Sequence, residues 1–211
     1  MSTRWNPTID VGDGQVRIPS PPVGTVARVL GALAVVLLVW TSYYQVGAEE
    51  MAVVQRFGAY VGTADPGLHF KLPFGIDRVT KVPVQRQLKM EFGFRTMQAA
   101  ARSTFAETPE TRAEALMLTG DLNVAVVEWI VQYRIRDAYA FLFHVRDVPE
   151  TFRYMSEAAM RQVVGDHSVD EVLTVGRESI ARQAKDELQR LCDMYSIGVE
   201  VQQLVLQDVN P

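Results

Sequence analysis

The feature that most restricts how this chain can fold is a run of sixteen uncharged residues, Val29 to Tyr44, close to its start. At 1.5 Å per residue, a helix of this length reaches about 24 Å, which is short of the roughly 30 Å hydrocarbon core of a bilayer. Val23 to Ala27 are also uncharged, and the Arg28 side chain can extend to the headgroups, so the helix can begin earlier. The sequence therefore predicts one transmembrane anchor over residues 23–46.

Aromatic residues mark the far end of this anchor, as they do at membrane interfaces. The residues assigned to the anchor are Val29, Leu30, Leu37, Leu38, Trp40, Tyr43 and Tyr44. A cleaved secretory signal is the alternative, because Val46-Gly47-Ala48 offers small residues at cleavage-like spacing. The long leader, with several prolines, and the length of the apolar run favour a retained anchor.

The charges on either side of the anchor predict its orientation. Three arginines, Arg4, Arg17 and Arg28, precede the uncharged run that begins at Val29, whereas Glu49, Glu50 and Arg56 follow it. Cytoplasmic flanks carry an excess of Lys and Arg, so the rest of the chain should lie outside the cytoplasm. Residues 1–22 mix Pro, Gly, Asp and Arg without periodicity, which predicts a disordered cytoplasmic tail.

About 165 residues follow the anchor, enough for a sizeable domain with its own core. The formal net charge of −4 and the sequence pI near 5.4 argue against a nucleic-acid partner, which would require a basic face. A single cysteine excludes an intramolecular disulfide. Cys192 recurs at helical spacing with Leu188, Leu191 and Tyr195, which predicts a small buried apolar side chain.

The first half of this region, residues 47–135, is rich in strand patterns. Met51 to Phe57 alternates and is followed by turn residues, which predicts two antiparallel strands joined by a loop. Residues 97–114 are rich in Ala, Thr, Ser and Glu and contain Pro109, which indicates a loop. The clearest strand runs from Ala125 to Ile135, with one apolar face that includes Trp129.

A second apolar segment lies only about twenty residues beyond the anchor. Its apolar side chains recur at every second position around Pro73 and Gly75, and prolines confine such pieces to sheet edges or bends. One interpretation is that the segment dips into the outer membrane interface, and the other is that it fills the core of a small β-subdomain. The residues of this segment are Pro66, Gly67, Leu68, Phe70, Leu72, Pro73 and Phe74.

The second half, residues 136–211, predicts a helix-helix-strand order. Asp147-x-x-Glu150 and Ser168-x-x-Glu171 have capping-box form, so two helices should begin near Val148 and Val169, the second ending at Gly198. The apolar phase of the last strand slips across Gln202-Gln203, which predicts a β-bulge. The fold class is therefore α+β.

No set of residues forms a recognisable active site. His69, His144 and His167 are scattered, without metal-ligand spacing to one another or a supporting cysteine pair. The sequence has no phosphate-binding loop ending in Lys-Ser/Thr and no G-x-S-x-G, and the capping role of Ser168 is favoured over catalysis. We therefore expect no catalytic, cofactor-binding or metal-binding residue; a scaffold is favoured and a membrane-anchored hydrolase is the alternative.

Eight short strings occur in one order along the chain. They are Arg56 to Gly58, Pro66 to Phe74, Lys81 to Val84, Gly93 to Arg95, Met117 to Asn123, Val131 to Arg134, Thr174 to Arg177 and Leu206 to Pro211. Together they resemble the band 7 (SPFH) superfamily of stomatin, prohibitin and flotillin, and most closely its bacterial HflK branch. The resemblance runs from about Val29 to the last residue.

The resemblance implies a non-enzymatic scaffold of the bacterial inner membrane, with a single-pass anchor, a cytoplasmic N-terminus, a periplasmic band 7 domain and no cofactor. It implies hetero-oligomers with an HflC-like paralogue that enclose and modulate the membrane AAA protease FtsH. A stomatin-like membrane organiser is the alternative within this class. Chains of this branch are expected to continue beyond Pro211 into a long Ala/Glu-rich coiled-coil helix, which is absent here. Either a longer product or a protein without that cage wall is expected.

Overall fold

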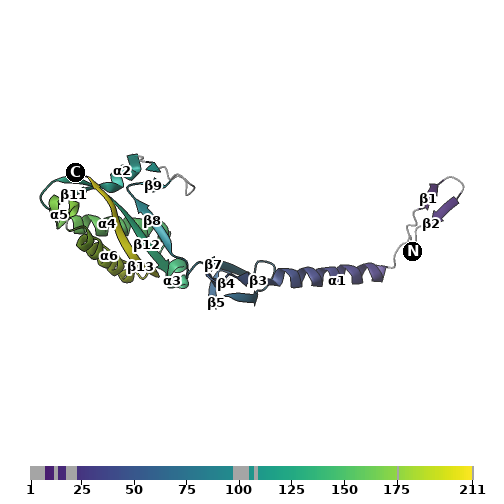
Figure 1. The fold of residues 1–211 in the computed structure, drawn as a ribbon. Helices are drawn as coiled ribbons and strands as arrows, with labels where there is room; N and C mark the ends of the chain where they lie inside the picture. The colour runs from purple at the N-terminus through teal and green to yellow at the C-terminus, as the bar shows by residue number, and fades with distance from the viewer. Residues whose placement is uncertain are drawn as a thin grey trace.

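The computed structural model describes residues 8–11, 14–17, 23–96, 105–106, 109–174 and 176–210. Within these residues an apolar helix leads into a small β region, and a larger sheet covered by helices follows (Figure 1). The mixed α+β fold predicted from the sequence is confirmed.

Helix α1 (Val23–Ser42) is the apolar segment predicted as the anchor, and Gly24–Ser42 is long and apolar enough to cross a membrane. The helix ends at Ser42, four residues before the expected end of the anchor at residue 46. Tyr43 to Val46 instead forms strand β3, which pairs with β6 (Gly67–Phe70). The strand replaces the last helical turn because the Lys71 N–H donates to the Ser42 carbonyl at 2.6 Å and continues that pairing.

The segment that precedes α1 was expected to be disordered, but the structure contains two short strands there. Strands β1 (Thr8–Val11) and β2 (Gly14–Arg17) pair antiparallel, with Val11 opposite Gly14. Ile9, Val11 and Val16 favour strands, and a Gly-Asp pair between the two strands has the composition of a hairpin turn. The other residues of the predicted tail lie outside the described ones.

The small β region holds a three-stranded sheet in the order β5-β4-β7. The strands are β4 (Met51–Arg56), β5 (Ala59–Ala64) and β7 (Asp77–Val82). The predicted strand after the anchor is present as β4, and its neighbours in the sheet are β5 and β7. β7 is an edge strand that stops directly before Pro83, where proline is tolerated.

The larger sheet is built around the long central strand β12 (Val124–Ile135). β13 (Val199–Asn210) pairs along one side of it, and the other side is shared by β11 (Leu116–Leu118) and β8 (Leu88–Phe92). β8 and β12 therefore belong to the same sheet as β13. This sheet includes strands from both sides of the expected division between residues 135 and 136.

One prediction about a loop needs correction, and one helix was missed. The segment expected to be a loop contains helix α2 (Pro109–Ala115), because Pro109 suits a first helical turn and helix-forming residues follow it. Strands β9 (Arg95–Thr96) and β10 (Phe105–Ala106) flank the remainder, and residues 97–104 and 107–108 lie outside the described residues. Helix α3 (Ala138–Phe143), which the sequence did not predict, is capped by Asp137.

The capping boxes predicted the helix starts correctly. Asp147 caps α4 (Val148–Gly165), and Ser168 and Glu171 form the complete box of the next helix. That second helix, however, is divided into α5 (Val169–Leu173) and α6 (Arg177–Met194). The chain packs tightly where they meet, since a Cβ on Gly176 would lie 2.6 Å from the Glu171 carbonyl oxygen.

The main core lies between the large sheet and helices α4 and α6. Trp129, Phe92 and Phe152 are among its fully buried side chains. The predicted bulge is confirmed, because the register shifts between Gln132 and Tyr133 as β13 passes Gln202. Cys192 is buried in this core, and desolvation raises the pKa of its thiol to about 12, as expected for a structural cysteine.

Candidate membrane-facing surface

The base of α1 is joined directly to one end of the small β region. Tyr43, the first residue after the helix, pairs with Phe70, and Lys71 is bonded to Ser42. The chain from Phe70 to Ile76 therefore lies beside the end of the helix. If α1 crosses a bilayer, this end of the β region lies at the surface of that bilayer.

Four apolar side chains of the predicted segment are exposed at this end. Phe70 is 78 % exposed and Phe74 is 84 % exposed, and Leu68 and Leu72 are exposed as well. Their exposure is contrary to the alternative in which they fill the core of the small β region. A group of exposed large apolar side chains close together in the chain is typical of a membrane or protein contact.

Phe57 and Phe74 share an unusual backbone conformation. Each has a positive φ, 50° and 64°, and each is followed by a glycine with positive φ. Left-handed conformations disfavour bulky side chains and are retained mainly where the surroundings enforce them. Phe57 is 82 % exposed, so two phenylalanines are held outward on neighbouring turns.

A buried carboxylate holds these two turns together. Asp77 forms a two-point ion pair with Arg56, with Nε–Oδ1 2.8 Å and Nη2–Oδ2 3.2 Å, and accepts the Leu72 N–H at 2.9 Å. The hydrogen bond from Arg56, and then that from Leu72, lowers the pKa of Asp77. The Phe57 N–H donates to the Ile76 carbonyl at 3.0 Å. The two turns are thus fixed relative to each other.

The segment predicted from the sequence to be either a membrane contact or a core segment includes most residues of this surface but not Phe57. A signal was present, since Phe57-Gly58 and Phe74-Gly75 are the same dipeptide at two turns between strands. The anchor residues are arranged as a lipid-facing helix requires, because nearly all side chains of α1 are exposed. Trp40 contacts Tyr43 with ring centroids 6.1 Å apart, and Tyr44 stacks on His69 at 5.7 Å.

A second exposed apolar group lies far from α1, at the edge strand β11. It consists of Leu116, Leu118, Leu122 and Val124, which we call the β11 edge surface. Leu118 and Val124 lie opposite each other on paired strands. Leu122 is 78 % exposed and has a positive φ of 65°. A leucine in this conformation is uncommon, so the turn must be well supported.

The support for Leu122 comes from the string Thr119 to Asn123. Asp121 accepts hydrogen bonds from the Thr119 hydroxyl at 2.6 Å, from the Asn123 amide and from the Val169 N–H at 3.2 Å. Gly120 packs closely, because a Cβ there would lie 2.9 Å from the Gly165 carbonyl oxygen. This string therefore fixes a tight turn against the helices and presents Leu122 to the solvent.

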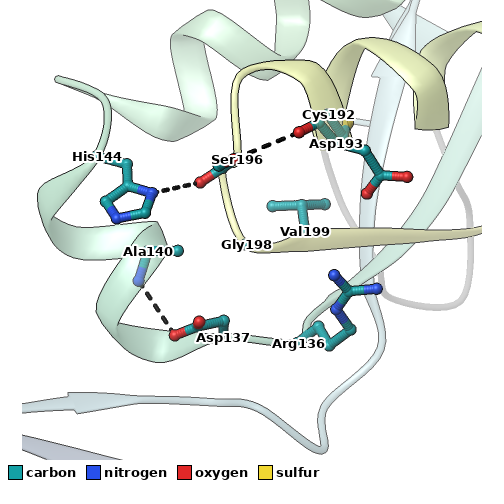
Figure 2. Close-up of a pocket in the computed structure, with 9 residues that line it drawn as sticks. All are labelled: Arg136, Asp137, Ala140, His144, Cys192, Asp193, Ser196, Gly198 and Val199. Carbon is teal, nitrogen blue, oxygen red and sulfur yellow. Dashed lines mark hydrogen bonds between the residues drawn. The ribbon is translucent and has the colours of Figure 1, made fainter.

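A pocket between α3 and the start of β13 offers no catalytic arrangement (Figure 2). His144 Nδ1 lies 2.8 Å from the Ser196 carbonyl oxygen, and Asp137 accepts the N–H groups of Tyr139 and Ala140. With its raised pKa, the Cys192 thiol stays protonated at neutral pH. Across the described ranges, no three His, Cys, Asp or Glu side chains are grouped to hold a metal ion.

Comparison with known proteins gives consistent matches. Residues 44–211 match the family described as "SPFH domain / Band 7 family". Protein HflK of Treponema pallidum (strain Nichols) is 40% identical over 164 residues, which are 77% of this chain and 49% of the relative. Modulator of FtsH protease HflK of Escherichia coli (strain K12) is 30% identical over 195 residues, 92% of this chain and 41% of the relative. The chain thus spans half or less of the length of these two curated relatives.

Proposed function

The chain belongs to the SPFH domain / Band 7 family, and from this premise we propose that it is a non-enzymatic membrane scaffold that modulates an FtsH-like membrane protease. In this proposal it assembles with an HflC-like paralogue, and the assembly encloses the protease and controls the access of substrates. The name of the Escherichia coli relative, Modulator of FtsH protease HflK, supports the protease as the partner.

The exposure of the β11 edge surface is the observation that best supports assembly with neighbouring subunits. It exposes four apolar side chains at a sheet edge far from the membrane-facing surface. The segment that builds it, residues 114–126, and the segment packed against its turn, residues 163–176, contain five acidic residues and no Lys or Arg, and one of the five, Glu114, is paired with Arg95 and Arg153. Neighbouring subunits of a ring meet through two different faces, so the adjoining subunit should present an apolar surface with a basic rim.

We expect Leu122→Asp to break the assembly without unfolding the chain. Asp tolerates the left-handed conformation better than Leu, and the position is exposed, so the folded protomer should remain stable. The added charge would be desolvated in the apolar contact, and it would also add to the acidic residues of its own subunit around the β11 edge surface. Size-exclusion chromatography of detergent extracts, with the HflC-like paralogue co-expressed, should show a shift from large assemblies to small species.

Met194→Asp is the matched control, since Met194 is also exposed and apolar but lies at the end of α6. It should leave the assembly size unchanged. Large assemblies of the Leu122→Asp variant would rule out this contact. A small wild-type species with measurable peptide hydrolysis would favour the membrane-anchored hydrolase, and an assembly that retains no FtsH-like protease would favour a stomatin-like organiser.

We further propose that the band 7 domain lies in the periplasm, with the membrane-facing surface touching the outer leaflet. Phe74→Cys and Gln203→Cys test both points in spheroplasts with a membrane-impermeant maleimide. The native Cys192 is buried and protonated, so its background labelling should be low. We expect fast labelling at position 203 and labelling at position 74 that is at least about tenfold slower until detergent is added.

The periplasmic location and the contact of the Phe74 turn with lipid would be contradicted by different results. Labelling at position 203 only after lysis would place the domain in the cytoplasm. Equal rates at positions 74 and 203 in intact spheroplasts would show that the Phe74 turn is not immersed in lipid. Thr63→Cys provides a control, because Thr63 is exposed on β5 and lies away from the helix end.

A further inference from the structure

The membrane-facing surface carries an imbalance of charge that the proposed scaffold does not use. Residues 40–46, 52–64 and 67–80 contain four charged side chains, namely Arg56, Lys71, Asp77 and Arg78. Asp77 is buried and paired with Arg56. Lys71 and Arg78 make no ion pair within the described part of the chain, so two uncompensated cations remain.

Both cations lie close in the chain to the exposed apolar residues. Lys71 follows Phe70 directly at the base of α1, and its N–H is bonded to Ser42. Arg78 follows Asp77 at the start of β7, just beyond the turn of Phe74 and Gly75. Apart from Asp77, which is paired with Arg56, the nearest acidic residue in sequence is Asp65, and it lies beyond the other end of β6, away from Phe70. No unpaired carboxylate from these three segments offsets the two cations.

We propose that Lys71 and Arg78 bind the headgroups of anionic phospholipids at this surface. The side chains of Phe70 and Phe74 would enter the boundary between headgroups and acyl chains, where apolar residues of interfacial segments lie. The charged groups of Lys71 and Arg78 would then lie at the depth of the lipid phosphates. Lipid is favoured over a protein partner because the surface is continuous with α1 and with the interfacial rings of Trp40 and Tyr43.

The consequence is selectivity for anionic over zwitterionic lipid beside the helix. A basic residue close to an anionic surface contributes about 1 kcal/mol, which is up to about fivefold per cation. The enrichment should fall as salt rises, because both cations are partly accessible to solvent. This inference rests on the proposed membrane anchoring of α1.

Quenching of tryptophan fluorescence by brominated lipids tests the proposal with the full chain in vesicles. With Trp5→Phe, the remaining tryptophans are Trp40, exposed at the base of α1, and Trp129, fully buried in the distal core. Quenching should therefore report lipid near Trp40. In mixtures of phosphatidylglycerol and phosphatidylcholine, we expect brominated phosphatidylglycerol to quench more strongly, with an apparent local enrichment of at least about twofold.

The double variant Lys71→Glu/Arg78→Glu should bring the enrichment to one or below, and Arg86→Glu, an exposed site at the far side of the β region, should leave it unchanged. Equal quenching by both lipids in the wild-type chain would overturn the inference while leaving the anchor intact. Absence of quenching by either lipid would instead contradict the anchoring itself. A wild-type enrichment that persists in the double variant would assign it to other residues and would also overturn the inference.

Discussion

Replacing Trp129 with alanine is expected to lower the free energy of unfolding by about 3–5 kcal/mol. Trp129 lies in the middle of β12, the strand that contacts β8, β11 and β13, and it is fully buried. Its ring stacks on Phe92 with centroids 4.5 Å apart and planes 3° apart. Its indole N–H also donates to the Ser156 hydroxyl at 3.1 Å.

Urea denaturation in detergent, followed by circular dichroism, measures this change. Trp129→Phe provides an intermediate case, since it keeps an aromatic ring beside Phe92 but removes the donor to the buried Ser156, at a cost of about 1–3 kcal/mol. Tyr154→Ala is the control, because Tyr154 is exposed on α4. A midpoint for Trp129→Ala that equals the wild-type value would show that the core does not depend on this stack.

The central strand could be predicted because its constraint is local. Eleven residues from Ala125 to Ile135 alternate between apolar and more polar side chains, and the structure buries every second one. The bulge at Gln202 was predicted for the same reason, since a slip in phase is visible in the sequence. The further register shift opposite Glu128 and Trp129 was not predicted, although the apolar phase slips there as well, from Leu206 to Val209 across Gln207-Asp208.

The elements that were missed depend on packing between distant segments. The break between α5 and α6 follows from the close approach of Gly176 to the Glu171 carbonyl group, while the apolar pattern continues through it. The six residues of α3 are too few for a helical period to be recognised. The end of α1 depends on the pairing of β3 with β6, and tyrosines suit either a membrane interface or a strand.

The candidate site was predictable in composition but not in exposure. Alternating apolar residues from Leu68 to Ile76 are equally compatible with a buried strand and with an exposed membrane contact. The difference arises from the backbone of Phe57 and Phe74, which turns both side chains outward. Asp77 stabilises this arrangement through its bonds to Arg56 and Leu72. The pairing of Asp77 with Arg56, 21 residues earlier, leaves no local sequence pattern from which it could be predicted.

Placing arginine at Leu33 is expected to abolish membrane retention, and placing it at Leu37 is expected to weaken retention less. An arginine at the centre of a membrane helix costs about 2.5 to 3.5 kcal/mol on insertion scales. α1 extends from Val23 to Ser42, so its midpoint falls beside Leu33. Leu37 lies about 6 Å closer to the interface, where an arginine side chain can reach the headgroups.

Carbonate extraction of membranes measures retention of both variants. The larger effect expected at Leu33 than at Leu37 follows from the end of α1 at Ser42. An anchor that reached residue 46 would place Leu33 and Leu37 at nearly equal distances from its midpoint. Thr41→Arg serves as the control, because Thr41 lies in the last turn of α1 and should tolerate the charge. Full retention of Leu33→Arg would contradict a bilayer-spanning α1. Equal loss for Leu33→Arg and Leu37→Arg would instead indicate that the hydrocarbon region extends beyond Ser42 toward the membrane-facing surface.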